Sequence, residues 1–123
     1  MLLVASIVVI AVLFLVISQN NFFGGDTLEN SKTTATNFMT NSPTYKFDGY
    51  SLNYISTNVL RCSYCWEHVF SFVSKYSGYG DRTGKAVSIN ITFHEEKVKV
   101  ENGKVSSAII DSRWDELNQK MIK

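Results

Sequence analysis

The sequence predicts an α+β domain that follows one N-terminal transmembrane helix, and three observations lead to this fold class. Residues 2–18 form an almost unbroken apolar run without a charged side chain. Residues 26–41 space their apolar side chains as a helix does, whereas residues 45–111 alternate apolar and polar side chains as strands do. A helix covering one face of an antiparallel sheet makes an α+β domain. We therefore expect a transmembrane anchor (1–23), a linker (24–26) and an extracytoplasmic α+β domain (27–123).

The N-terminal apolar run is predicted to be a membrane anchor that stays attached to the domain. A helix of this composition is apolar all round, which suits a bilayer, and its length is near the lower limit of roughly 17 residues for a span. A cleaved secretory signal peptide is the alternative, with a cleavage site at Ser18, although the basic residues that usually precede such a run are missing. The side chains expected in lipid or at its interface include Leu2, Val8, Leu13, Phe14, Phe22 and Phe23.

Charge and small residues indicate how the anchor is oriented and what it meets. The first basic residue is Lys32 and one residue precedes the span, so we expect a cytoplasmic N-terminus and an extracytoplasmic C-terminal domain at the cell membrane. Ala5, Ser6 and Ala11 mark a face for close packing against another helix. The expected partners are membrane lipid and membrane-protein subunits. Nucleic acid is not expected, because the net charge is +1 and basic and acidic residues are interleaved.

The first helix of the domain is predicted to begin near Asp26 and to end before Pro43. Residues 26–29 match a helix N-cap with an acidic residue at its third position, and a proline ends a helix at the residues before it. Many residues in between are Thr and Asn, which are poor helix formers, so packing must hold the helix. Its expected buried face consists of Leu28, Ala35, Phe38 and Met39.

The strands are predicted to form a meander of four or five antiparallel strands with one apolar face. The clearest alternation puts Ile89, Ile91 and Phe93 on that apolar face and His94 on the polar face.

The chain is predicted to close with a hairpin and a short helix. Asn102-Gly103 is a strong signal for a type I′ turn, in which both central residues need positive φ. Ser112 and Asp115 are spaced as a helix cap pair. With apolar residues at helical spacing, they predict a short C-terminal helix that starts at residues 111–115 and has a buried stripe of Trp114, Leu117 and Met121. One helix packed on a curled meander is a cystatin-like arrangement.

Cys62 and Cys65 are the two cysteines of the chain, and outside the cytoplasm such a pair usually forms a disulfide. Positions three apart on a strand point to opposite faces, so the bridge requires a turn between them. Two alternatives stay open. In the first alternative the cysteine pair is redox-active, although the helix N-terminus that lowers a thiol pKa is missing. In the second alternative the pair binds a metal ion. No other cofactor is expected, and the candidate metal ligands are Cys62, Cys65, His68 and His94.

A glycine-rich loop at residues 78–84 is the second candidate site. It is expected to be long and exposed, and loops on a rigid scaffold often carry function. The alternative is a flexible hairpin connection whose glycines supply positive φ. The side chains predicted to contact an anion or a protein partner are Tyr79, Asp81, Arg82 and Thr83.

Catalytic patterns are missing from the sequence, and we do not expect an enzyme. There is no G-x-S-x-G motif, only two histidines occur, and the paired carboxylates are adjacent residues on segments typical of a surface.

Five segments together resemble small archaeal exported or membrane-anchored proteins of unknown function. They are residues 41–49, the Arg61-Cys62-x-x-Cys65 segment, the 78–84 loop, residues 98–105 and Trp114-Asp115. The paired cysteines followed by V-x-V-x-N-G-K-V also resemble a bacterial secreted domain of unknown function. The resemblance implies an extracytoplasmic domain and no activity.

The leading hypothesis is a single-pass protein whose extracytoplasmic domain binds a partner, as an accessory or structural subunit of a membrane protein complex. A metal-handling or thiol–disulfide domain using Cys62 and Cys65 is the first alternative. A pilin-like filament subunit, with the apolar helix packed in a fibre core, is the second.

Overall fold

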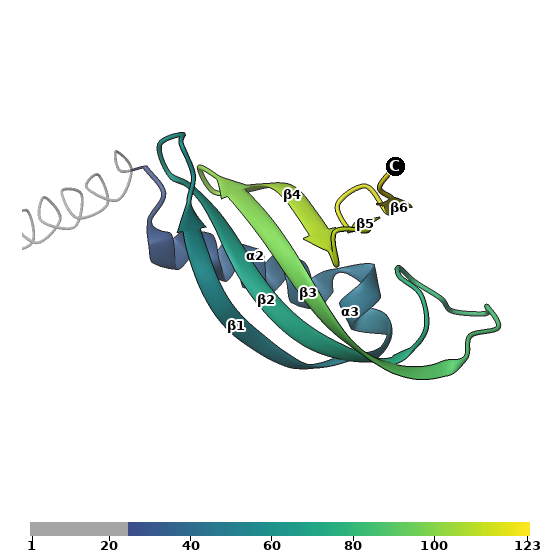
Figure 1. Cartoon of the computed structure of the whole chain (residues 1–123). Coiled ribbons are helices and arrows are strands. Elements are labelled where there is room, and N and C mark those ends of the chain that lie inside the picture. The colour runs from purple at the N-terminus through teal and green to yellow at the C-terminus, as the bar shows by residue number, and fades with distance from the viewer. Residues whose placement is uncertain (1–24) are drawn as a thin grey trace, which may run out of the picture.

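A computed structural model describes residues 25–123, which form one antiparallel sheet with helices on one face (Figure 1). The predictions for the anchor, with its lipid-facing and helix-packing residues, lie outside this range. Within it, no helix has the length and apolar character of a membrane span. The elements are α2 (Leu28–Asn41), α3 (Pro43–Asp48), β1 (Gly49–Val59), β2 (Cys65–Tyr76), β3 (Ile89–Glu101), β4 (Lys104–Ile110), β5 (Trp114–Asp115) and β6 (Lys120–Met121).

The sheet is a meander in which each strand pairs with the next, in the order β1-β2-β3-β4-β5-β6. Figure 1 shows β1, β2 and β3 as long curved strands, with α2 lying along one face. The predicted α+β class and antiparallel meander are confirmed. The hairpin between β3 and β4 is confirmed as well, because Asn102 and Gly103 both have positive φ.

The N-cap of helix α2 is Thr27, one residue later than predicted, because the Thr27 hydroxyl accepts a hydrogen bond from the backbone N–H of Asn30. Its buried side chains are Ser31, Ala35 and Met39, which are four residues apart and so form one stripe. Pro43 does end this helix, and it also starts α3, which the sequence analysis did not predict. Proline suits the first turn of a helix, where a backbone N–H has no partner to lose.

The core lies between α2 and the face of the sheet that α2 covers. Phe70 and Phe72 of β2 fill its centre, and Tyr45 of α3 packs edge-to-face on Phe72 with ring centroids 5.6 Å apart. The buried cluster consists of Ala35, Met39, Phe70, Phe72, Val98, Val100, Ala108 and Ile110.

The predicted orientation of β3 is wrong. Ile89, Ile91 and Phe93 are 80%, 64% and 81% exposed, whereas His94 is buried. The cause lies further along the strand, where Val98 and Val100 belong to the core. A strand alternates strictly, so core residues at even positions force odd positions outward along its whole length. Helix α2, about 21 Å long, covers only part of β3, which spans about 40 Å.

The predicted C-terminal helix is also wrong, because β5 and β6 form a small hairpin there and bring the sheet to six strands. Asp111 and Ser112 have φ of 54° and 57°, and Gln119 has φ of 54°. These values lie in the left-handed region, which a right-handed helix cannot contain. The expected buried stripe does not form, since Leu117 and Met121 are exposed.

Candidate interaction surface

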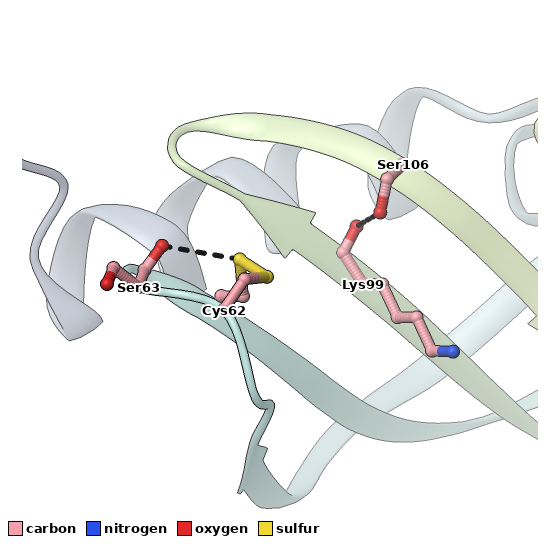
Figure 2. Close-up of a disulfide and its surroundings, with 5 residues drawn as sticks. Cys62, Ser63, Lys99 and Ser106 are labelled. Carbon is pink, nitrogen blue, oxygen red and sulfur yellow. Dashed lines mark hydrogen bonds between the residues drawn. A yellow bond between two sulfur atoms is a disulfide. The ribbon is translucent and has the colours of Figure 1, made fainter.

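Cys62, in the turn after β1, and Cys65, the first residue of β2, lie at disulfide distance, with Cα atoms 5.5 Å apart (Figure 2). The turn that the sequence analysis required is present, because Tyr64 has φ of 59°. The Tyr64 ring packs directly against Gly25, at the start of the described chain. The cysteine pair therefore closes the hairpin tip beside the point where the chain enters the domain.

The four candidate metal ligands do not come together. His68 is buried and shares hydrogen bonds of 2.8 Å with the hydroxyls of Ser31 and Thr57, one at each ring nitrogen. Burial, followed by the positive charge of Lys32, lowers the pKa of His68. Across residues 25–123 no group of three or more His, Cys, Asp or Glu side chains is arranged to hold a metal ion.

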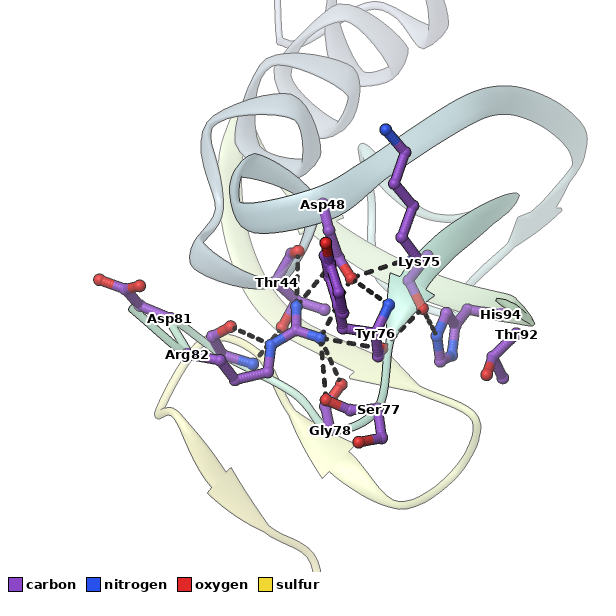
Figure 3. A network of polar contacts seen from close by, with 12 residues as sticks. Thr44, Asp48, Lys75, Tyr76, Ser77, Gly78, Asp81, Arg82, Thr92 and His94 are labelled. Carbon is purple, nitrogen blue, oxygen red and sulfur yellow. Dashed lines mark hydrogen bonds and ion pairs between the residues drawn. The ribbon is translucent and has the colours of Figure 1, made fainter. Parts of the chain in front are cut away.

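Two of the four residues predicted to bind a partner in the 78–84 loop hold the loop in place instead. Arg82 is 3% exposed and pairs with Asp48 at 2.9 Å, and its guanidinium also donates to the carbonyl oxygens of Thr44 and Gly78 (Figure 3). The Tyr79 hydroxyl donates to Asp111 at 2.9 Å, and its ring stacks on another aromatic side chain, Trp114. Burial, with the hydrogen bond to Asp111, raises the pKa of Tyr79 to about 12.

The other two predicted loop residues, Asp81 and Thr83, are exposed. The backbone N–H and the hydroxyl of Thr83 both donate to the Asp81 carboxylate, which lowers the pKa of Asp81. These side chains therefore satisfy each other. They line one wall of an open cleft of about 620 Å³, whose other residues are Asn41, Pro43, Lys46 and Phe47.

Sequence reasoning missed a buried chain of hydrogen bonds from Ser74 through His94 to Asp111. The Ser74 hydroxyl lies 2.8 Å from His94 Nε2, and His94 Nδ1 lies 2.5 Å from Asp111 Oδ2. This is the order of groups in a serine hydrolase triad. The Ser74 side chain is fully buried, however, so a substrate carbonyl has no approach to its oxygen. This series of hydrogen bonds ties β2 and β3 to the turn after β4. Ser74, His94 and Asp111 are too far apart in the sequence to form a recognisable motif.

Glu96 is a buried carboxyl group with an unpaired oxygen. The residue is 1% exposed, and Oε2 has no hydrogen-bond partner among residues 25–123. Burial, followed by the negative charges of Glu116 and Asp111, raises the pKa of Glu96 to about 8. Glu116 is satisfied in contrast, because the Thr44 backbone N–H, the Thr44 hydroxyl and the Trp114 indole N–H all donate to it.

The first part of β3 has an open edge, because β4 pairs with β3 only from Glu96 onward. Just before that position, the Glu95 carbonyl accepts from the Asp111 N–H at 2.8 Å, and the Glu95 N–H donates to the Asp111 side chain at 2.9 Å. The Glu95 backbone therefore points away from β2. The Ser88 carbonyl points toward β2, since it accepts from the Ser77 N–H.

Backbone groups alternate in direction along a strand, so the N–H and C=O groups of Ile89, Ile91 and Phe93 point to the same open side as those of Glu95. The side chains of these three residues are also exposed. We call residues 89–93 the open β3 edge. Folded proteins usually protect such an edge with charges, proline or a bulge. Residues 86–94 include no charged side chain and no proline, and the one irregularity in this segment is a register shift of the β2–β3 pairing between Thr92 and Ile89. The open β3 edge is therefore the candidate interaction surface.

The apolar character continues across the outer face of the sheet. Phe93 pairs with Val73 of β2, and Val73 pairs with the partly exposed Tyr50 of β1. Paired residues lie on the same face of a sheet, so Phe93 belongs to an apolar row that continues through the buried Val73 to Tyr50. Comparison with known proteins adds no functional assignment to this surface: no family model, no curated protein and no solved structure matches the chain.

Proposed function

We propose that this chain is a single-pass membrane protein whose extracytoplasmic domain binds another protein chain, as an accessory or structural subunit of a membrane complex. The observation that carries the proposal is the open β3 edge, with three exposed apolar side chains on residues whose backbone groups are free to pair. The apolar run at residues 2–18 supports a membrane location, and the paired cysteines support an oxidising compartment. We also propose that the domain is cystatin-like, with one main helix on a curled meander.

The mode of binding that this edge favours is the addition of a strand. An extended segment of the bound chain would take its main-chain hydrogen bonds from Ile89, Ile91 and Phe93. Their side chains would supply the apolar contacts on the outer face. The bound segment would need the same alternation of apolar and polar residues, because its own side chains would also point to the two faces in turn.

Co-purification of the full chain in a gentle detergent tests this function. Phe93→Lys should release the bound chain, because it places a charge in the apolar row. Val59→Lys is the matched control, since Val59 is also 81% exposed but lies on β1. We expect the wild type and Val59→Lys to retain a stable neighbour and Phe93→Lys to lose it. A protein without any stable neighbour, or equal retention by Phe93→Lys, would contradict the proposal.

A further inference from the structure

We infer that the chain bound at the open β3 edge is a second copy of this protein, joined through antiparallel pairing of the two β3 strands about a two-fold axis at Ile91. The inference rests on the proposed function, because it names the partner for the same surface. It is carried by the residues of the edge, which complement themselves in this register.

In the two-fold register, apolar side chains lie opposite apolar ones on one face of the sheet, and polar side chains lie opposite polar ones on the other face. Ile91 lies opposite its own counterpart, and Ile89 lies opposite Phe93, so the apolar rows of the two copies form one continuous row. The backbone N–H and C=O groups of Ile89, Ile91 and Phe93 point toward the second copy. Each of these residues therefore forms a hydrogen-bonded pair with the residue opposite it, and the pair exchanges two N–H···O bonds. On the other face Asn90 lies opposite Thr92, both polar. Aromatic and β-branched pairs of this kind stabilise a sheet.

Charge favours the same arrangement. Residues 86–94 contain no charged side chain, so no like charges are buried by the pairing. Beyond the paired segments, Glu95 and Lys85 are both exposed and of opposite sign. A second copy therefore meets apolar side chains in the middle of the contact and no like charges within it.

The paired segments also end before they reach other strands. Ser88 of one copy lies opposite His94 of the other, and β4 begins only at the next positions, where Ile110 pairs with Glu96. Strand β3 begins at Ile89, so the chain of the second copy has left the sheet by the point where β4 would obstruct it.

The N-terminal run of the same chain is a poorer occupant. The described chain starts at the opposite end of β3, where the Asp26 N–H donates to the Asn102 side chain at 3.4 Å. Eight residues of β3, 94–101, separate this point from the open β3 edge, a distance of about 30 Å. The run at residues 2–18 is apolar almost throughout, whereas a strand added at this edge needs apolar and polar residues in alternation.

Cysteine crosslinking of the full chain in detergent tests the register. The two native cysteines are paired, so Ile91→Cys supplies a single free thiol. Hydrogen-bonded pairs have Cα atoms about 5.5 Å apart, which is within the range of a disulfide. We expect mild oxidation to convert Ile91→Cys into a covalent dimer of twice the 13.9 kDa chain mass. Val59→Cys, equally exposed but on β1, should stay monomeric, and adding Phe93→Lys to Ile91→Cys should abolish the crosslink.

Ile91→Pro provides a second measurement. The Ile91 N–H points away from β2, and Ile91 lies at the register shift where it has no paired β2 residue. Proline there removes an edge donor and breaks no β2–β3 residue pair. We expect light scattering to give a dimer for the wild type and a monomer for Ile91→Pro, with an unchanged circular dichroism spectrum.

The outcomes separate this inference from the proposed function. A monomeric wild type without Ile91→Cys crosslinking overturns the second copy as the occupant. If Phe93→Lys then still releases a different protein, the proposed function stands and only the inference fails. If no protein of any kind is released, both fail. Dimers that crosslink equally through Val59→Cys indicate contact elsewhere, and they also overturn the inference.

Discussion

At the scale of single residues, the buried acid Glu96 makes the stability of the domain depend on pH in an unusual direction. Most paired carboxylates have a lowered pKa and stabilise a protein as the pH rises. Glu96 has a pKa raised from 4.5 to about 8, because burial disfavours its charged form. The folded state therefore holds a proton that the unfolded state releases between these two pH values.

We predict that Glu96 lowers stability as the pH rises from about 4.5 to about 8, and that its contribution is constant above that range. At about 1.4 kcal/mol per pKa unit, the loss amounts to a few kcal/mol. Glu96→Gln removes the titration, so its stability relative to the wild type should increase across this window. Denaturant unfolding at a series of pH values measures it. Glu95→Gln, at the exposed neighbouring position, is the control, and equal pH profiles for wild type and Glu96→Gln would refute the prediction.

Arg82 shows how a residue chosen for its exposure can prove to be structural. The 78–84 loop is rich in glycine and was expected to lie open, yet Arg82 turns inward, pairs with Asp48 and lies over the Phe47 ring, with its guanidinium carbon 4.5 Å from the ring centroid. The sequence alone could not show this, because Asp48 precedes Arg82 by 34 residues. Burial of the ion pair requires the whole fold.

We predict that Arg82→Leu destabilises the domain by about 3–5 kcal/mol, since it leaves the buried Asp48 carboxylate without its cation. Lys85→Leu removes a positive charge at an exposed position close by and should change stability little. Thermal unfolding of both variants in the same detergent makes the comparison. An equal effect of the two substitutions would show that the pair with Asp48 contributes nothing specific.

At the scale of elements, β3 explains which parts of the fold could be predicted. The helix at residues 28–41, the order of the strands and the Asn102-Gly103 turn depend on local patterns, and all three are present. Which face of β3 is buried depends on where α2 lies on the sheet. No local sequence pattern predicts that position. A signal did exist, however, because Val98 and Val100 have the opposite parity to Ile89 and Ile91 within one continuous strand.

The C-terminal hairpin and the buried polar clusters could not be predicted for the same reason. Trp114 and Leu117 fit helical spacing, but positive φ values at Asp111 and Ser112 turn the chain before a helix can begin. The Asp111 side chain and backbone are bonded to Tyr79, His94 and Glu95, which hold that turn in place. These contacts join segments that are distant in the sequence, so they appear only once the sheet has formed.

At the scale of the whole molecule, the proposed anchor and the proposed docking edge act at separate places. We predict that replacing Ala5 and Ala11 by Leu weakens assembly with another membrane helix, because larger side chains keep the two backbones apart. Insertion into the membrane should persist, since leucine is as apolar as alanine or more so. Membrane fractionation and co-purification measure the two effects separately.

The comparison with the edge variants makes this prediction specific. The Ile91→Cys crosslink should survive the leucine substitutions if the domains pair through β3. Unchanged assembly in the leucine variant would reduce the N-terminal run to a simple tether.

The position of the chain entry at one end of β3 has a consequence for a pair of these molecules. An antiparallel strand pair has its symmetry axis perpendicular to the sheet, so the two entry points lie at opposite ends of the pair, roughly 65 Å apart. If the proposed anchors are present, both would reach one bilayer only with the axis parallel to the bilayer normal, which would lay the strands flat along the lipid surface. If the strands instead stood perpendicular to the bilayer, the β3–β3 contact would join two facing membranes and would serve as an adhesive contact between them.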